Sequence, residues 1–348
     1  MKKSNVVNLI QYHVEHNNRA FMDEAFEIAR DFDQNGDSNL AGYIMSLLSS
    51  SGAFTTQAYE ADFDYLVKTS TSNRPLPLPD SIFEDVRGII NAASRDVGIN
   101  KFLFKGRPGS GKTETAKQIA RLMNRELLSV DFNAVIDSKL GQTSKNISSL
   151  FKEIARLSNQ NNYVLLFDEI DALILDRVNS SDLREMGRAT STFLRELDDM
   201  GSRVVLIATT NLYDYFDKAV LRRFDFVVDF DRYAHKDLCD VAETILEQML
   251  SKFEVRGRNA RLFRKILSRS DSLPYPAELE NIIKTSVAFS SPSIEGDYLR
   301  RLYVALVKNP TDNIQELKTQ GFTLKEIEIL TDTSKSSVAR KLEDANVK

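Results

Sequence analysis

A short glycine-rich segment constrains the fold of this chain more than any other part of the sequence. Lys101–Thr113 reads KFLFKGRPGSGKT and contains the pattern GxxxxGK[ST] at Gly106, Gly111, Lys112 and Thr113. Glycines let the backbone wrap around phosphate oxygens and direct N–H groups at them, and a following helix adds its positive N-terminus. An apolar segment precedes the pattern and a helical pattern follows it, as such a loop requires. We therefore predict a phosphate-binding loop between a buried strand and a helix.

The apolar pattern around this loop predicts the fold class. Segments of strand length alternate with helical patterns, and the strand-like segments are 102–104, 127–132, 163–167, 204–208 and 226–230. Such alternation indicates β–α units around a buried, largely parallel sheet. Beyond His235 only helical patterns follow, near 235–252, 260–269, 276–289 and 294–308. The predicted fold class is α/β with an added helical region.

Polar residues stand directly after two of the predicted strands. YVLLFD ends in Asp168 and is followed by Glu169, while Asn211 follows the next predicted strand. Asp168 at a strand end would hold Mg²⁺ through the water shell of the ion, and the Thr113 hydroxyl would ligate it. Glu169 is the predicted general base that polarises the attacking water. Asn211 would orient that water or sense the γ-phosphate.

Two adjacent arginines, Arg222 and Arg223, lie between a helical pattern and the last predicted strand. An arginine that reaches the γ-phosphate of a neighbouring subunit accelerates hydrolysis by about 10³–10⁵. Both arginines are therefore predicted to be catalytic, and isolated protomers are expected to be poor enzymes.

Together these motifs resemble an AAA+ ATPase module, specifically the AAA clade of membrane-bound proteases and disassembly chaperones. The resemblance covers residues 82–308: GRPGSGKT is similar to Walker A, LLFDEIDAL to Walker B, ATTN to sensor 1, LRRFD to the arginine-finger segment and SLPYPAELENIIK to the lid segment. It implies a parallel sheet of strand order 5-1-4-3-2, a helical lid and a homo-oligomeric ring, usually a hexamer. It also implies that ATP and Mg²⁺ bind between subunits, with both arginines acting in trans. The residues expected to bind the nucleotide are Gly106, Pro108, Gly109, Ser110, Gly111, Lys112, Thr113, Glu114 and Asp168, of which Thr113 and Asp168 also ligate Mg²⁺.

The resemblance and the flanking composition divide the chain into five expected parts. These are an N-terminal helical docking domain (1–70), a proline-rich linker (71–81), an α/β ATPase subdomain (82–232), a helical lid (233–309) and a helix-turn-helix-like unit (310–348). Prolines fix φ and remove backbone donors, so the linker is expected to be stiff and extended.

The central-pore loop departs from the pattern of the family. Members that unfold proteins carry an aromatic residue before the glycine of this loop, whereas Asp137–Thr143 has Lys139 at that position. A lysine does not grip a threaded apolar chain as an aromatic ring does. Remodelling of one specific partner is therefore favoured over processive threading.

The C-terminal segment 321–343 resembles a helix-turn-helix, with Ser334–Leu342 as the recognition helix. Its Lys335, Ser336, Arg340 and Lys341 are candidates for contacts with DNA phosphates or bases. Asp332 stands where the turn prefers glycine, and Thr333 stands where an apolar residue normally packs. Residues 311–348 hold six basic and seven acidic side chains, so no broad basic patch supports DNA binding. DNA contact and protein contact both remain open for this unit.

Composition limits the environment and the partners. A net charge of −4 argues against coating of nucleic acid or anionic membrane. The single cysteine, Cys239, excludes an intramolecular disulfide, and the apolar runs are too short to span a membrane. We therefore expect a cytoplasmic protein with no membrane partner.

The predicted function is Mg²⁺-dependent ATP hydrolysis in an oligomeric ring that remodels or regulates a specific protein partner. That partner would be engaged through the N-terminal helices or the pore. The arrangement of the N-terminal helices also resembles that of bacterial AAA ATPases paired with a subtilisin-like protease, which would be the partner. The alternative is a DNA-associated ATPase, such as a transposition or plasmid-maintenance helper, that uses the C-terminal unit. A third interpretation is a nucleotide switch that does not hydrolyse ATP.

Overall fold

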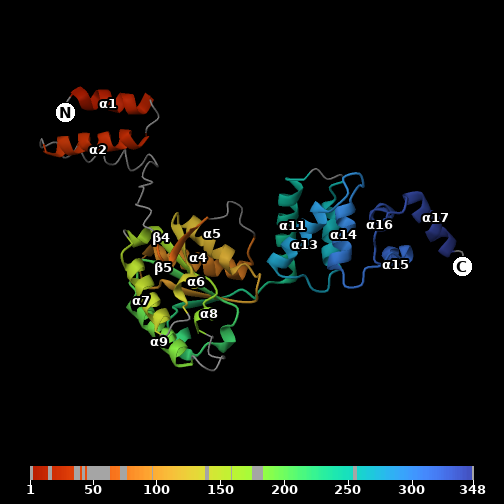
Figure 1. Ribbon diagram of the computed structural model, residues 1–348. Helices are drawn as coiled ribbons and strands as arrows, with labels where there is room; N and C mark the ends of the chain where they lie inside the picture. Colours follow the sequence, from red (N-terminus) through yellow and green to blue (C-terminus); the bar gives the residue numbers. More distant parts are fainter. Residues whose placement is uncertain are drawn as a thin grey trace. The chain divides into compact units, whose positions relative to one another are not determined.

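The computed structural model describes residues 3–14, 18–34, 40, 44, 63–70, 77–95, 97–137, 141–157, 159–174, 183–253 and 257–346. The chain forms two compact units, Met1–Phe63 and Asp64–Lys348. In the first unit, helices α1 (Lys3–Val14) and α2 (Asn18–Gln34) lie side by side (Figure 1). The Asn8 amide donates to the Glu24 carboxylate at 3.3 Å, and the rings of His13 and Phe21 lie 5.8 Å apart. Among the described helices, none combines the length and the apolar sequence that a membrane span requires.

The second unit is built on a six-stranded, mostly parallel sheet. Its strands are β1 (Leu66–Thr69), β2 (Lys101–Lys105), β3 (Glu126–Val130), β4 (Tyr163–Phe167), β5 (Val205–Thr210) and β6 (Phe226–Asp229). The order across the sheet is β1-β3-β4-β5-β2-β6. Strands β2 to β6 are parallel to one another and keep the relative order 5-1-4-3-2 when β2 is counted as the first. The predicted α/β class is confirmed.

Strand β1 corrects two of the predictions. It pairs antiparallel with β3, Leu66 opposite Val130, so the predicted five-strand order is incomplete. The expected helical domain of residues 1–70 is also wrong at its end, because 66–69 belong to the sheet and the units divide after Phe63. An edge strand of four residues in which only Leu66 is buried leaves too short an apolar pattern to be recognised in the sequence.

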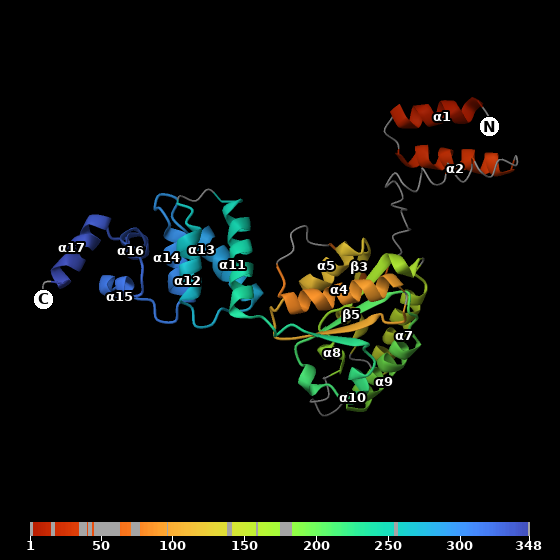
Figure 2. The ribbon, with the colours of Figure 1, turned by 180° about the vertical axis from the view of Figure 1, so that it is seen from behind.

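Helices cover both faces of the sheet (Figure 2). Helices α4 (Asp80–Arg95) and α5 (Lys112–Leu122) lie on one face, and α7 (Gln142–Ala155) and α9 (Leu183–Asp199) lie on the other. The shorter helices of this part are α6 (Phe132–Val135), η1 (Gln160–Asn162), α8 (Asp171–Ile174), η2 (Tyr213–Tyr215) and α10 (Lys218–Leu221). Ile119 of α5 packs with Leu166 and Ile207. On the opposite face, Phe167 lies 6.0 Å from the ring of Phe151. Burial on both faces explains why these strands are almost continuously apolar.

The start of α4 shortens the expected linker. The helix begins at Asp80, inside the predicted segment 71–81, and the Pro79 carbonyl accepts the N–H groups of Ile82 and Phe83 at 2.9 Å. Residues 71–76 of that segment lie outside the described residues.

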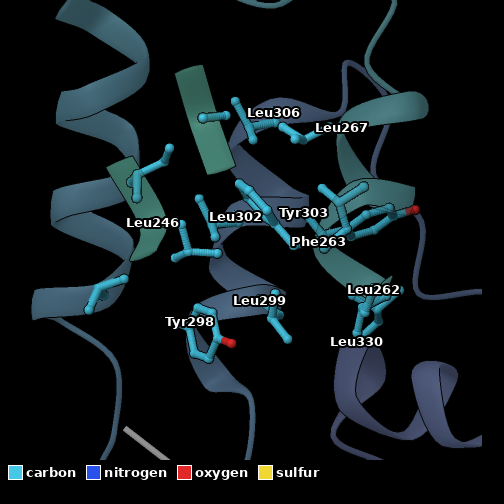
Figure 3. Close-up of a cluster of buried hydrophobic side chains, with 14 of the residues drawn as sticks. Leu246, Leu262, Phe263, Leu267, Tyr298, Leu299, Leu302, Tyr303, Leu306 and Leu330 are labelled. Atoms are coloured by element: carbon cyan, nitrogen blue, oxygen red, sulfur yellow. The ribbon is translucent and has the colours of Figure 1, made fainter. Parts of the chain in front are cut away.

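The C-terminal region is helical, as predicted. Its helices are α11 (His235–Leu250), α12 (Ala260–Ser268), α13 (Pro276–Ala288), α14 (Asp297–Leu306), α15 (Ile314–Thr319), α16 (Leu324–Thr331) and α17 (Lys335–Asn346). One hydrophobic cluster extends from Leu238 to Val338 and includes Tyr298, Tyr303 and Leu330 (Figure 3). Helices on both sides of residue 310, where we expected the lid to end, therefore share a single core.

Candidate nucleotide site

The glycine-rich segment forms the loop between β2 and α5. Gly109 and Gly111 have φ of +75° and +98°, a region that L side chains rarely adopt. A Cβ atom at Gly109 would also lie 2.9 Å from the Cβ of Ala277. Helix α5 begins directly after Gly111, so its first free N–H groups lie at the loop. The local geometry is that of an anion-binding helix start.

A pocket of about 630 Å³ opens at this loop. Its walls are formed by the loop and α5, by the ends of β4 and β5, and by lid helices α11 and α13. The predicted site residues that line it are Pro108, Gly109, Gly111, Lys112, Thr113, Glu114, Asp168, Glu169 and Asn211. Gly106 and Ser110 do not line it: Ser110 is fully buried, and Gly106 packs against Phe230.

Lys112 connects the loop to the sheet. Its Nζ donates to Asn211 Oδ1 at 2.8 Å and to the carbonyls of Gly106 and Arg107 at 2.7 and 3.0 Å. Burial lowers the pKa of Lys112, while carboxylates including Asp231 act in the opposite direction. The ammonium is therefore partly desolvated, which strengthens its interaction with an anion in the pocket.

The oxygen atoms suited to a divalent cation are adjacent. The Thr113 hydroxyl donates to Asp168 Oδ1 at 2.9 Å. A hydroxyl and a carboxylate at the edge of an anion-binding loop match the oxygen-donor preference of Mg²⁺. The residues present thus fit a magnesium–nucleotide complex.

Thr209, which the sequence motifs left unassigned, binds the Asp168 carboxylate and the Glu169 backbone. Its hydroxyl donates to Asp168 Oδ1 at 2.7 Å and accepts the Glu169 N–H at 2.8 Å. Glu169 has φ of +55°, which is uncommon for a residue other than glycine and typical of functional sites. The hydroxyl in ATTN, two residues before Asn211, was the signal available in the sequence.

Asn211 is positioned in turn by Asp171. The Asp171 carboxylate accepts the Asn211 N–H at 3.1 Å and the Thr210 hydroxyl. The Asn211 side chain then lies between Lys112 and Glu169, donating to Glu169 Oε1 at 3.4 Å. The predicted base and the predicted sensor are thus in contact at the pocket.

The two arginines differ from each other. Neither lines the pocket. Arg223 donates to Asp198 at 2.9 Å and to the Ala219 carbonyl at 2.8 Å, and its side chain is 15% exposed. Arg222 is exposed after α10, and among the described residues its guanidinium forms no ion pair. Of the two arginines, Arg222 alone is exposed and has no ion pair among the described residues.

Two further observations concern residues around the site. The lid adds pocket residues that the sequence analysis did not assign, namely Gln248, Lys252 and Glu280. Lys139 of the expected pore loop lies outside the described residues, so the interpretation of that loop stays a prediction.

Residues 102–232 match the family model described as "ATPase family associated with various cellular activities (AAA)". This segment is an AAA ATPase domain. It contains the phosphate loop, both carboxylates, Asn211 and both arginines. The recognition made from the motifs is therefore confirmed for this part of the chain.

The AAA domain has relatives in bacteria, fungi and archaea. An uncharacterized AAA family ATPase, y4kL, of Sinorhizobium fredii is 41% identical over 38% of this chain and 39% of its own length. The peroxisomal ATPase PEX6 of Arthrobotrys oligospora is 31% identical over 63% of this chain and 20% of its own. A putative 26S proteasome regulatory subunit homolog of Methanothermobacter thermautotrophicus is 25% identical over 59% and 54%. The alignments span at most about half of these relatives.

A solved structure supports the fold. A chain of the E. coli MS115-1 HORMA:CdnC:Trip13 complex superposes with a TM-score of 0.54 and 16% identity, over 71% of this chain and 97% of that one. At this identity the similarity concerns the fold alone, and it extends beyond the AAA domain.

Proposed function

We propose that this chain is a Mg²⁺-dependent ATPase that works as an oligomeric ring and remodels a specific protein partner. The observation that carries the ATPase proposal is the contact of Asn211 with both Lys112 and Glu169 at the mouth of the phosphate loop. This contact joins the cation expected at the phosphates to the base expected at the attacking water. The domain match and the ATPase relatives support the same activity.

The chain's own residues divide the work of hydrolysis. The loop N–H groups and Lys112 bind the phosphates, and Thr113 and Asp168 hold the metal. When bound, Mg²⁺ neutralises negative charge on the phosphate oxygens. Glu169, fixed by Thr209, accepts a proton from the water aligned for attack, and Asn211 orients the carboxylate.

The oligomeric part of the proposal rests on Arg222. The side chain is exposed and lies away from the pocket of its own chain, as expected of a residue that completes the site of a neighbour. Arg223 is instead bound to Asp198 and fixes α10 to α9. We therefore assign the finger role to Arg222 and a supporting role to Arg223.

A protein partner is the proposed object of the ATPase cycle. The relative described as a proteasome regulatory subunit homolog supports this class of partner. A subtilisin-like protease is one candidate, and helices α1 and α2 are the proposed docking element.

The test of the activity is Glu169→Gln. The variant should bind ATP with unchanged affinity and hydrolyse it about 10²–10⁴ times more slowly, because the amide does not accept the proton. Nucleotide binding and phosphate release are measured on the same preparation, with exposed Glu126→Gln as the matched control. Turnover equal to wild type would contradict the base assignment. A wild-type chain that binds ATP without turnover would instead favour the nucleotide switch.

One observation favours the DNA-associated alternative. Helices α16 and α17 are joined by a tight turn in which Asp332 has φ of +53°, and Lys335, Arg340 and Lys341 are exposed along α17. Under this alternative, duplex binding is salt-sensitive and is lost in the Arg340→Ala, Lys341→Ala double variant. Absence of an electrophoretic shift at about 50 mM salt would rule it out.

A further inference from the structure

Arg107 links the phosphate loop to the lid, although it does not line the pocket. Its backbone N–H donates to Asp231 Oδ1 at 2.9 Å. Its guanidinium carbon lies 5.8 Å from the centre of the Tyr275 ring, within the range of a cation–π interaction. Burial raises the pKa of Tyr275, and the nearby Asp231 carboxylate raises it further. Arg107 thus contacts Asp231 through its backbone and Tyr275 through its side chain, and we call these three residues the latch.

The three residues come from different parts of the fold. Arg107 belongs to the phosphate loop, Asp231 to the connection between β6 and α11, and Tyr275 to the position just before α13. Asp231 therefore lies where the chain passes from the AAA domain into the lid. Tyr275 lies where the lid meets the phosphate loop.

A second contact lies beside the latch. The Ala277 N–H in the first turn of α13 donates to the Gly109 carbonyl at 3.0 Å. Because Gly109 has no Cβ, the helix start approaches the loop closely; a Cβ there would lie 2.9 Å from that of Ala277. The phosphate loop thus contacts the lid at two positions, Arg107 and Gly109.

Tyr233 packs beside the latch and contacts Tyr275. It packs against the core of the sheet and against the core of the C-terminal helices, and its ring lies edge-on to Tyr275 at 6.1 Å. Within the exposed connection, Tyr233 is therefore the residue that packs against both parts. A rotation of the lid would change the position of Tyr275 over Arg107.

We propose that Arg107, Asp231 and Tyr275 couple the position of the lid to the conformation of the phosphate loop and thereby control nucleotide exchange. The inference rests on the proposed ATPase function. The Arg107 carbonyl also accepts from Lys112, so a movement of Arg107 reaches the phosphate-binding ammonium within one residue. The latch residues are positioning residues, because none of them lies where the reacting atoms would bind.

The chain contains no tryptophan, which permits a direct optical test. Tyr275→Trp retains an aromatic ring over Arg107 and introduces the only indole in the protein. We expect its emission to change when MgADP is added. The change should disappear when Arg107→Ala is combined with Tyr275→Trp, and should remain with the exposed control Arg87→Ala.

Exchange kinetics test the function of the latch. Arg107→Ala should release fluorescent ADP about two- to fivefold faster than wild type, since an exposed cation–π contact is lost. Arg107→Lys should restore most of the slow release, because a lysine also binds a ring face. In a Tyr275→Leu background, Arg107→Ala should have no further effect, because its partner is already absent. Tyr275→Phe retains the ring face, so Arg107→Ala should still speed release in that background. This variant keeps the test valid if Tyr275→Leu fails to fold.

Single-turnover hydrolysis separates the latch from the chemistry. The rate for preloaded ATP should stay within about twofold of wild type in Arg107→Ala, because no reacting atom is touched. Unchanged ADP release in Arg107→Ala and Tyr275→Leu, or effects that simply add, would overturn the latch. A parallel fall in single-turnover rate would also overturn it. If wild type binds no nucleotide, the ATPase proposal itself fails; if it binds and the variants exchange normally, only the latch fails.

Discussion

Buried polar contacts serve different purposes at the active edge of the sheet and in the C-terminal helices. At the sheet edge, Thr209 holds Glu169 in a backbone conformation that a non-glycine residue seldom adopts. In the C-terminal region, Lys265 of α12 donates to Glu326 at 2.8 Å and to the Gly321 carbonyl at 2.7 Å. The first network places reactive groups, whereas the second joins helices into one core.

This difference predicts how variants should behave. Changes at the sheet edge should reduce turnover with little effect on unfolding, because the surrounding strands are fully buried and remain packed. Changes among the C-terminal helices should shift unfolding with little effect on the chemical step. The variants at Thr209, Glu326 and Asp332 test that contrast, and the arginine pair tests the same distinction between chemistry and stability within the AAA domain.

The largest effect is expected at the arginine pair. Arg222→Ala should reduce hydrolysis by about 10³-fold without changing the melting temperature, because the exposed side chain has no described ion pair to lose. Arg223→Ala should lower the melting temperature by removing the bonds to Asp198 and the Ala219 carbonyl. Steady-state turnover and thermal melts of both variants provide the comparison.

Mixed oligomers test whether Arg222 acts in trans. Arg222→Ala subunits mixed with Glu169→Gln subunits should recover part of the activity, since some sites then combine an intact base with an intact finger. Activity that remains at the level of the separate variants would contradict action in trans. A larger loss of turnover in Arg223→Ala than in Arg222→Ala would reverse the assignment.

The next effect is expected at Thr209. Thr209→Val keeps the shape of the side chain but leaves the Glu169 N–H without its acceptor. We expect kcat to fall about 10- to 100-fold, because the predicted base is no longer held in position for the attacking water. Nucleotide affinity should change less, because Lys112 and the loop are untouched. Thr244→Val, on the exposed side of α11, is the control, and an equal loss there would contradict a positioning role.

The sequence predicted some features of the fold and of the site but not others, for a physical reason. The phosphate loop, Asp168, Glu169 and Asn211 lie in short motifs whose chemistry depends on local spacing, and the structure brings them to one pocket. The five parallel strands were recognisable because burial on both faces makes them apolar. Strand β1, the role of Thr209 and the difference between the arginines depend on contacts with residues distant in sequence, which no local pattern contains.

A smaller effect, on stability, is expected at Glu326. Burial alone would raise the pKa of this carboxyl, but the Lys265 ammonium and the Thr323 N–H outweigh it, so the pKa lies below the ordinary 4.5. A lowered folded-state pKa means that the carboxylate stabilises the fold above about pH 4.5 and that this stabilisation is lost as the pH falls further. The side chain is 6% exposed.

Glu326→Gln should therefore destabilise the C-terminal helices by about 1–3 kcal/mol at neutral pH. Its melting temperature should also depend less on pH below 4.5 than that of wild type. Circular dichroism melts between about pH 3 and 7 measure both effects. Glu343→Gln on the exposed side of α17 is the matched control, and an acid dependence equal to wild type in Glu326→Gln would contradict the assignment.

The smallest effect is expected at the turn between α16 and α17. Asp332 ends α16 with φ of +53°, where glycine is favoured, and its carboxylate lies 3.8 Å from Arg300 at an exposed position. Asp332→Gly should stabilise the region by about 0.5–1 kcal/mol, because relief of left-handed strain exceeds the loss of a weak surface ion pair. Gly296→Ala provides the opposite case, since its Cβ would lie 2.8 Å from Ile329 at φ of +74° and should destabilise the packing of α14 on α16. A lower melting temperature in Asp332→Gly would show instead that the ion pair with Arg300 stabilises this turn. The pair would then hold a left-handed residue in place, as the Thr209 contacts do for Glu169 at the sheet edge.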